Sequence, residues 1–523
     1  MANHTRTEYS FINMAASLGG YVLNILLSFI CRIVFVHQLN AEYLGINGLF
    51  SNILSMLSLA ELGIGSAMIY ALYKPVAEDN HRKVASYMRV YGKAYKVIGI
   101  VIAIVGLILT PFLNLLIKDP PNIPENITVI YLIFLFSTVS SYFYSYRSSI
   151  LIAHQENYIV LAISYIVVII QDLAQISVLV LFKNYMMYLI LQVIFVLLTN
   201  ILISKAAQKK YPYIDDKNAE KLSKSETKTL IKNIKALTVT KLSGVLVNNT
   251  DNIVITYFNG LIATGVVSNY TLITNTINSL ANQVFTSISA SLGNLNAIGS
   301  EDHKYEVFKA LNLANFWLYG WASIGIICLS NDIVALFFGN SYVMNIQIPI
   351  ILAINFYMLG MQCVVGLYKS TMGLFRYGQY VLLFTAALNL LGDIILGKYW
   401  GVFGIFLATA LSRVCTNTWY EPYVVFKYGF HKKFSSYIKR YLFYLGLLVA
   451  ICAICYFTDS LLHLSLIPRL IIKVLLCIVI PNALFILCFR RLSEFQYLVC
   501  AINGLKQKLM ARIKGHSFKR AQR

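Results

Sequence analysis

The stretch from Arg32 to Leu57-Ser58-Leu59-Ala60-Glu61-Leu62-Gly63-Ile64-Gly65, through the turn His37-Gln38-Leu39-Asn40-Ala41-Glu42, decides the fold. It places Arg32 and Glu61 inside segments that are otherwise apolar enough to span a bilayer. An ion in hydrocarbon costs at least about 2.5 to 3.5 kcal/mol, so each charge needs a partner or a watery cavity. We therefore expect the helices that carry Arg32 and Glu61 to form walls of a polar cavity at membrane depth.

The composition excludes a soluble globular protein. Hydrophobic residues make up 58% of the 523 residues and charged residues 12%, whereas soluble domains average about 25% charged residues. The chain is therefore expected to be a polytopic membrane protein. Its net charge of +21 does not indicate nucleic-acid binding, because the basic residues lie in short loops between apolar segments, where they set membrane orientation.

The apolar segments predict about fourteen transmembrane helices and an all-α fold. A crossing needs about 20 apolar residues, and lipid offers no partner to an open sheet edge. The polar residues 1–10 lead into the first span without a cleavage pattern, so no signal peptide is expected to be removed. The predicted spans are 11–37, 44–73, 94–117, 129–153, 158–182, 186–206, 234–258, 263–296, 306–330, 346–368, 378–397, 401–426, 437–456 and 468–490.

The distribution of Lys and Arg predicts the orientation of these spans. Four of the 43 basic residues lie in loops or near span ends on one side, four lie deeper within spans, and the other 35 lie in loops or near span ends on the opposite side with both termini. Because the side rich in Lys and Arg is normally cytoplasmic, both ends are expected in the cytoplasm. The four on the outer side are Lys118, Lys183, Lys398 and Arg469, and the four within spans are Arg32, Lys241, Arg413 and Lys473.

Two halves of the chain look repeated. The segment around Gly45 matches that around Gly265 at a shift of 220 residues, and the segment around Arg147 matches that around Lys369 at a shift of 222. Parallel six-helix repeats are related by an axis along the membrane normal, and in transporters the substrate site lies where such repeats meet.

The repeat divides the chain into five predicted parts. The division predicts two pseudo-symmetric six-helix lobes, an extra helical pair and a tail. The tail carries one apolar stripe, so it is either an interfacial helix on anionic lipid or a solvated basic segment. The parts are an N-lobe (1–206), a cytoplasmic linker (207–232), a C-lobe (233–430), the extra pair (431–490) and the basic tail (491–523).

Three residues are the main candidates for the cavity. The planar fork of Arg32 suits a pyrophosphate, although Arg32 could instead neutralise an acid between two helices. Glu61, beside Gly63, is either the counter-ion of Arg32 or a site for H⁺ or Na⁺. By the repeat, Arg32 pairs with Asn252, so Asp251 falls at nearly the equivalent place and has the same choice of roles.

Other charged residues within or at the ends of spans are weaker candidates. Lys241 and Arg413 could contact the substrate, or serve as an interface anchor and an inter-helix ion pair respectively. Asp172 could hold a structural hydrogen bond or couple to a cation. Asp393, near the outer end of its span, could simply be solvated, and Lys473 is expected to snorkel to the interface. Arg147 and Lys369 are either orientation residues or entry-side phosphate contacts.

No catalytic motif is present. The sequence contains no complete Gly-x-x-x-x-Gly-Lys-Ser/Thr phosphate loop, because its one Gly-x-x-x-x-Gly-Lys run (392–398) is followed by Tyr399. It also contains no His-Glu-x-x-His and no Gly-x-Ser-x-Gly. These motifs are the marks of nucleotide hydrolysis, zinc proteolysis and acyl transfer. We predict no catalytic residues, no metal site and no cofactor apart from coupled H⁺ or Na⁺. Any driving force must come from an ion gradient, the membrane potential or consumption of the cargo.

Four motifs resemble the multidrug/oligosaccharidyl-lipid/polysaccharide (MOP) exporter superfamily, and within it the polysaccharide transporter branch with the Wzx-type flippases. The resemblance covers roughly residues 10–430. The second span carries Glu61 where members commonly have Asp, and the extra helical pair is similar to the fourteen-helix lipid II flippases. The motifs are Leu44-Gly45 followed by Leu59 to Ala67, Arg147 to Tyr158, Asn249 to Ile255, and Gly401 to Ile405 with Ala408-Thr409-Ala410.

The resemblance implies a flippase that moves an undecaprenyl-pyrophosphate-linked oligosaccharide, a repeat unit of O-antigen, capsule or exopolysaccharide, across a bacterial cytoplasmic membrane by alternating access. A polysaccharide polymerase and glycosyltransferases are the implied partners, beside membrane lipids. The 36 tyrosines could stack on sugar rings, although many must be interface anchors. The alternatives are an ion-coupled multidrug exporter, whose cargo would favour acids in the cavity, and a lipid II-type flippase. A membrane-embedded glycosyltransferase would need a large catalytic loop, and a scaffold would have no use for ions at membrane depth.

Overall fold

The computed structural model of the chain is built of helices and turns. It describes residues 6–503 apart from short gaps, and no strand occurs in that part of the chain. The predicted basic tail therefore lies mostly outside the described residues. The gaps are 62–63, 114–116, 118–120, 122, 155, 217–218, 220–221, 289–291, 294, 297–298, 375–376, 461–464 and 502.

The chain forms two compact units. Unit 1 comprises Met1–Ser268 with Leu390–Ile405, and unit 2 comprises Asn269–Asn389 with Phe406–Arg523. These limits differ from those of the predicted lobes, because the first part of the long helix α10 (Lys224–Ser287) packs with the N-terminal helices. The division into lobes stays a prediction.

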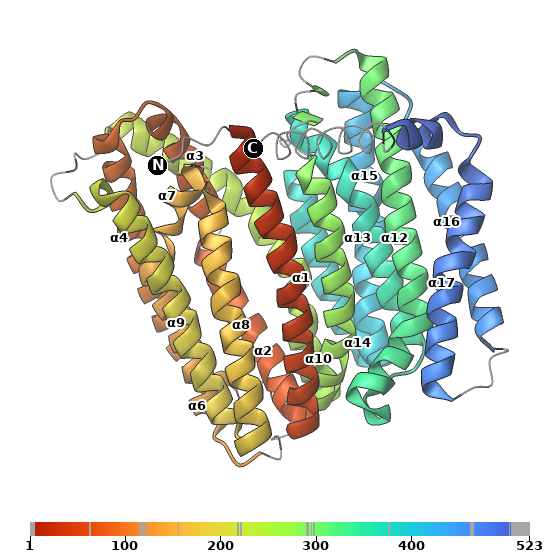
Figure 1. Ribbon diagram of the computed structural model, residues 1–523, viewed down its shortest axis with the longest axis horizontal. Coiled ribbons are helices and arrows are strands. Elements are labelled where there is room, and N and C mark those ends of the chain that lie inside the picture. Colours follow the sequence, from red (N-terminus) through yellow and green to blue (C-terminus); the bar gives the residue numbers. More distant parts are fainter. Residues whose placement is uncertain are drawn as a thin grey trace, which may run out of the picture. The chain divides into compact units, whose positions relative to one another are not determined.

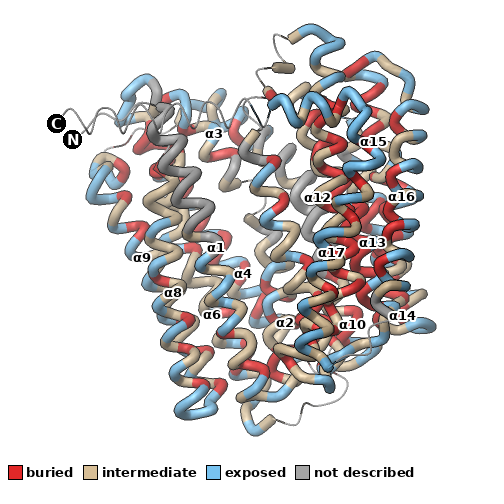
Figure 2. Tube along the Cα trace, turned by 45° about the vertical axis from the view of Figure 1, so that its right-hand side comes forward, coloured by how far each residue is buried: buried red, intermediate tan, exposed pale blue. Residues whose placement is uncertain are grey.

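In unit 1, the long helices pack pairwise: α1 lies along α8, α8 along α9, α9 along α6, and α6 along α4 (Figure 1). Few residues of α8 and α9 are buried (Figure 2), as expected for helices that face lipid. Besides α10, the elements are α1 (Arg6–Gln38), α2 (Ala41–Leu57), η1 (Ser58–Glu61), α3 (Ile64–Ala77), α4 (His81–Leu109), η2 (Thr110–Phe112), α6 (Ile127–Ser145), α7 (Ser148–Ala153), α8 (Asn157–Phe182), α9 (Tyr185–Lys210) and η3 (Pro212–Asp215).

Asparagine starts four of these helices. Asn40, Asn80, Asn126 and Asn184 each accept a hydrogen bond from a backbone N–H of the first turn of α2, α4, α6 and α9. Such a cap satisfies a donor that has no partner within the helix. The turns between the spans are therefore encoded locally.

In unit 2, α12 is the central helix and packs against α13, α16 and α17. Buried residues gather on α12 and α13 (Figure 2), and most of α13 is buried. The elements of unit 2 are the second part of α10, α12 (Glu301–Phe338), η4 (Asn340–Tyr342), α13 (Gln347–Thr371), α14 (Gln379–Cys415) without its middle part Leu390–Ile405, α15 (Asn417–Val424), a π-helix (Val425–Gly429), α16 (Ser435–Ser460) and α17 (Leu466–Phe489).

The structure contains ten helices that are long and apolar enough to cross a membrane within the described residues, rather than fourteen. Two of these candidate spans each contain a glycine with a left-handed backbone, Gly260 (φ 83°) and Gly401 (φ 56°), where a predicted pair of spans meets. The first predicted span lies within α1 (Arg6–Gln38), and the second is a segment broken between α2 and α3. The protein is a multi-pass membrane protein, and the number fourteen stays a prediction.

The predicted repeat has a reciprocal contact inside unit 1. A Cβ on Gly45 would come within 2.2 Å of the Leu261 carbonyl oxygen, and a Cβ on Gly265 within 2.3 Å of the Ala41 carbonyl oxygen. At the shift of 220 residues, Gly45 is equivalent to Gly265 and Ala41 to Leu261. Residues that contact each other's equivalents in this way surround a two-fold axis. The close crossing of α2 and α10 is therefore what a pair of parallel repeats predicts.

Candidate functional site

Arg32 lies beside this crossing. Its guanidinium donates a short hydrogen bond to the Ser268 hydroxyl on α10. The equivalent contact also exists, because the Asn252 amide nitrogen approaches within 4.0 Å of the position that a Cβ would take on Gly48. Arg32 corresponds to Asn252 and Ser268 to Gly48 at the same shift of 220. Arg32 therefore joins α1 to α10 beside the crossing of α2 and α10.

Three carboxyl groups share the depth of Arg32 in unit 1. At a rise of 1.5 Å per residue, Arg32, Asp172, Asp251 and Asp393 each lie about 9 to 15 Å from the end or break of their helix. These helix ends lie together, since a Cβ on Gly401 would come within 2.7 Å of the Asn259 amide and Gly265 touches Ala41. The four residues therefore form one layer, which we call the charged layer.

Asp172 belongs to the neighbourhood of Arg32. Its carboxylate accepts a hydrogen bond of 2.9 Å from the Ser28 hydroxyl, and it is 5% exposed. Both Cys31 and Tyr188 lie within electrostatic range of Arg32 and of Asp172. The sequence indicated a hydrogen bond or a coupling role for Asp172, and the structure shows the hydrogen bond. It does not test the coupling.

Asp251 and Asp393 interact with each other. Asp393 is fully buried and lies within electrostatic range of Asp251, so the interpretation of Asp393 as a solvated residue is wrong. Two carboxylates that share a buried site repel unless one holds a proton or a cation lies between them. The described residues contain no group of three or more His, Cys, Asp and Glu suited to a metal ion.

Glu61 is not the counter-ion of Arg32. At the helical rise per residue, Glu61 lies about 30 Å beyond the start of α2, whereas Arg32 lies about 9 Å before the end of α1. The depths of the two residues therefore differ by roughly 20 Å. Its carboxylate accepts a short hydrogen bond from the Tyr95 hydroxyl, and the Tyr91 hydroxyl lies 3.1 Å from that of Tyr95. The structure thus places Arg32 and Glu61 at two separate polar sites.

The remaining candidates are Arg413 and Lys241. Arg413, in unit 2, is 7% exposed and donates a hydrogen bond of 3.3 Å to the Asn355 carbonyl on α13. Its side chain therefore packs against α13, and its contact with substrate stays a prediction. Lys241 lies on α10, but its side chain falls outside the described residues.

The two cations that match in the predicted repeat are both ion-paired. Arg147 lies 2.7 Å from Asp215 in unit 1, and Lys369 lies 3.0 Å from Glu421 in unit 2. Both interpretations of these residues stay open.

A buried ion cluster in unit 2 escaped prediction. Asp332 on α12 accepts hydrogen bonds from Arg469 (2.5 Å) and Lys473 (2.6 Å) on α17. Lys473 is 8% exposed, so the expectation that it snorkels to the interface is wrong. Lys473, seven residues into α17, has its partner on another helix. The sequence signal for this ion pair was the acidic residue Asp332 near the end of α12.

The sequence also missed the tyrosines around Glu61. Tyr91 and Tyr95 are four residues apart on α4, and the ring of Tyr142 on α6 lies 5.6 Å from that of Tyr95. A Cβ on Gly65 would come within 3.2 Å of both the Tyr91 and Tyr95 hydroxyls. The spacing of the tyrosines was a usable signal, since residues four apart share one face of a helix.

Comparison with known proteins finds relatives in structure alone. No protein-family model matches the sequence, and no curated protein matches it at a significant level. Several solved membrane transporters share the fold.

Three of these structures are representative. The lipid II flippase MurJ in an inward closed conformation matches with a TM-score of 0.63 at 16% identity, over 90% of this chain and 98% of MurJ. An inward-facing multidrug resistance MATE transporter of the MOP superfamily matches with a TM-score of 0.62 at 12% identity, over 79% and 98%. A mutant of the Vibrio cholerae MATE transporter VcmN matches with a TM-score of 0.55 at 14% identity, over 82% and 97%. The chain therefore has the fold of the transporters and flippases of the MOP superfamily.

Proposed function

We propose that this protein is a flippase that moves an undecaprenyl-pyrophosphate-linked oligosaccharide from the cytoplasmic to the outer leaflet of a bacterial cytoplasmic membrane. The observation that carries the proposal is the position of Arg32, which lies at membrane depth and joins the contact between repeat-equivalent residues. In transporters built of repeats, substrate sites lie at such places. A guanidinium there matches the oxygens of a pyrophosphate.

The extent of the structural match supports a lipid-linked cargo. MurJ, named as a lipid II flippase, matches 90% of this chain, whereas the inward-facing MATE transporter matches 79%. The difference is about as large as α16 (26 residues) and α17 (24 residues) together. Solved structures with this fold carry inward closed, inward-facing and outward-facing conformations, which supports transport by alternating access.

The cargo would move with its polar head in the protein and its polyprenyl tail in lipid. The Asp251–Asp393 pair would bind and release the coupling proton or cation. Both termini would lie in the cytoplasm, and glycosyltransferases and a polysaccharide polymerase would supply and consume the cargo. The repeat unit of a surface polysaccharide is the head group that the sequence motifs favour, and lipid II is the one that the likeness to MurJ favours.

A second candidate is an ion-coupled exporter of organic cations. The observation in its favour is the charged layer itself, which holds three carboxyl groups, Asp172, Asp251 and Asp393, and one guanidinium. A cationic drug would be attracted by carboxylates that are not neutralised. Greater susceptibility of a deletion strain to cationic dyes, with normal surface polysaccharide, would establish this candidate in place of the first.

Complementation of a deletion strain tests the first candidate. We expect the deletion to accumulate lipid-linked saccharide on the cytoplasmic side, with the sugar of the accumulated lipid distinguishing a repeat unit from lipid II. Arg32→Ala should fail to restore export at normal abundance. Arg32→Lys should restore it partly, because it keeps the charge and loses the planar fork. The control is Arg82→Ala, at an exposed arginine. Normal export by Arg32→Ala would remove the proposed role.

A further inference from the structure

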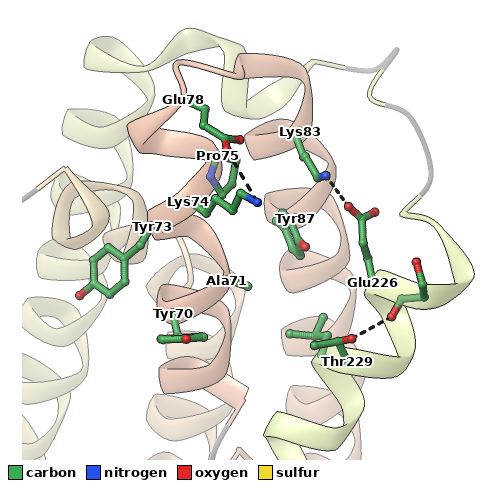
Figure 3. A pocket seen from close by; sticks show the side chains of 12 residues that line it. Tyr70, Ala71, Tyr73, Lys74, Pro75, Glu78, Lys83, Tyr87, Glu226 and Thr229 are labelled. Atoms are coloured by element: carbon green, nitrogen blue, oxygen red, sulfur yellow. Dashed lines mark hydrogen bonds and ion pairs between the residues drawn. The ribbon is translucent and has the colours of Figure 1, made fainter.

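A pocket of about 690 Å³ opens at the end of unit 1 where α3 ends and α4 begins. Figure 3 shows its three walls: Tyr70 and Lys74 come from α3, Lys83 and Tyr87 from α4, and Glu226 and Thr229 from the first turns of α10. Ligand sites typically measure about 300 to 1,000 Å³. The pocket is therefore large enough for a short oligosaccharide.

The lining of this pocket combines aromatic rings with hydrogen-bonding groups. Tyr70 is 69% exposed and Tyr73, at the rim, is 47% exposed. Within the part of the chain that the structure describes, neither hydroxyl has a hydrogen-bond partner. The faces of aromatic rings are electron-rich, so they attract the C–H groups on the face of a sugar ring. Free hydroxyls beside them can bond to the sugar's own hydroxyls.

The charges in the pocket balance. Lys74 lies 3.9 Å from Glu78, and Lys83 forms a short ion pair with Glu226 (Figure 3). With two lysines and two glutamates, the pocket carries no excess charge that would select an anion or a cation. This distinguishes it from the charged layer, and it suits an uncharged polyhydroxyl group.

The wall made by α10 is rigidly built. The Ser223 hydroxyl accepts a hydrogen bond of 3.2 Å from the Glu226 backbone N–H, and the Glu226 carboxylate accepts one of 3.1 Å from the Ser223 N–H. This is a capping box, which satisfies two donors at a helix start. Glu226 thus occupies the positive end of α10 and also binds Lys83 of α4, so the start of α10 is fixed against α4.

The face of α4 that lines the pocket also carries the tyrosines around Glu61. Tyr87, Tyr91 and Tyr95 follow one another at intervals of four residues, which places them on one helical face. Tyr87 lines the pocket, whereas Tyr95 donates its hydrogen bond to Glu61. The pocket and the tyrosine site of Glu61 are therefore neighbouring parts of the same face of α4.

We propose that this pocket binds the sugar residues of the lipid-linked cargo at the cytoplasmic entrance, with Tyr70 stacking on a sugar ring and the polar groups of α4 and α10 bonding to its hydroxyls. The inference rests on the proposed flippase function and adds a head-group subsite to it. It also separates the task of sugar selection from that of pyrophosphate binding at Arg32.

Two binding measurements on the purified full-length protein in nanodiscs test this proposal. One probe is the lipid-linked oligosaccharide extracted from the source bacterium, and the other is undecaprenyl pyrophosphate without sugar. Tyr70→Ala should weaken binding of the sugar-bearing lipid about tenfold, the size of one lost aromatic contact, and leave binding of the sugar-free lipid unchanged. Tyr70→Phe should retain most of the affinity, because it keeps the ring.

Tyr380→Ala is the matched control, because Tyr380 on α14 is 68% exposed and does not line the pocket. It should change neither affinity. If Tyr70→Ala changes neither affinity, or weakens both equally as a membrane-interface anchor would, the sugar subsite is overturned while the flippase proposal stands. If the wild-type protein binds neither lipid, the proposed function itself fails.

Discussion

At the scale of single residues, Gly45 and Gly265 make the repeat testable. Alanine at either position would place a Cβ within 2.2 or 2.3 Å of a backbone carbonyl oxygen, so α2 and α10 would have to move apart. Overpacking of this kind costs about 1 to 3 kcal/mol. Because the two contacts are reciprocal, we expect Gly45→Ala and Gly265→Ala to lower the thermal unfolding midpoint in detergent by similar amounts.

The control for this pair is Gly325→Ala, at a helical glycine with open space around its Cβ position. Its unfolding midpoint should match or exceed that of the wild type, because alanine favours helix. A large loss of stability in one of the two close-contact variants and none in the other would contradict the reciprocal contact.

Residues whose environment is one helix were predictable, and residues that depend on a partner far away in sequence were not. Arg32 stands out in the sequence because a charge in an apolar span is costly and needs a partner or a water-filled cavity. Its partner Ser268 is 236 residues away and has no distinguishing sequence signal. Lys473 was misinterpreted for the same reason, since its partner Asp332 is 141 residues away.

At the scale of elements, the contact between α4 and α10 should respond to acid. The hydrogen bond from Lys83 holds the pKa of Glu226 below its ordinary value of 4.5, and the Ser223 N–H adds to the effect. A carboxyl with a lowered pKa stabilises the folded contact above its unfolded pKa and loses that effect as the pH falls through the folded one. We therefore expect the contact to persist at neutral pH and to loosen below about pH 4.5.

Spin labels at the exposed positions Arg82 and Lys228 would measure the distance between the two helices. A narrow distance distribution at pH 7 should broaden in acid. In Glu226→Gln it should be broad at both pH values, because the amide cannot form the ion pair. An acid-induced change of equal size in Glu226→Gln would assign the effect to other groups, such as Glu78.

The helices themselves were largely predictable, because apolar length and asparagine caps are local properties. The two glycine breaks fall where the sequence ended one span and began another, at Gly260 and Gly401. The depth of Glu61 was not predictable for two reasons. The helix α2 changes to a 3-10 turn at Ser58–Glu61, and the tyrosine that donates a hydrogen bond to the Glu61 carboxylate belongs to another helix, α4.

At the scale of the whole molecule, unit 1 contains both proposed contacts with the cargo, the pyrophosphate contact at Arg32 and the sugar pocket between α3, α4 and α10. In unit 2, charged residues have a structural role instead. Asp332 forms ion pairs with Arg469 and Lys473, and these pairs fix α17 to α12. The helical pair α16 and α17 is therefore integrated into unit 2 by charge as well as by packing.

The central claim is that the protein carries a lipid-linked saccharide across the bilayer and that Arg32 is required. The most direct measurement is the accessibility of the extracted lipid-linked oligosaccharide to a membrane-impermeant lectin in proteoliposomes. Wild-type protein should expose the inner-leaflet pool to the lectin over time, whereas Arg32→Ala should leave that pool protected, as in protein-free liposomes. Exposure by Arg32→Ala at the wild-type rate, or no exposure by the wild type, would contradict the account.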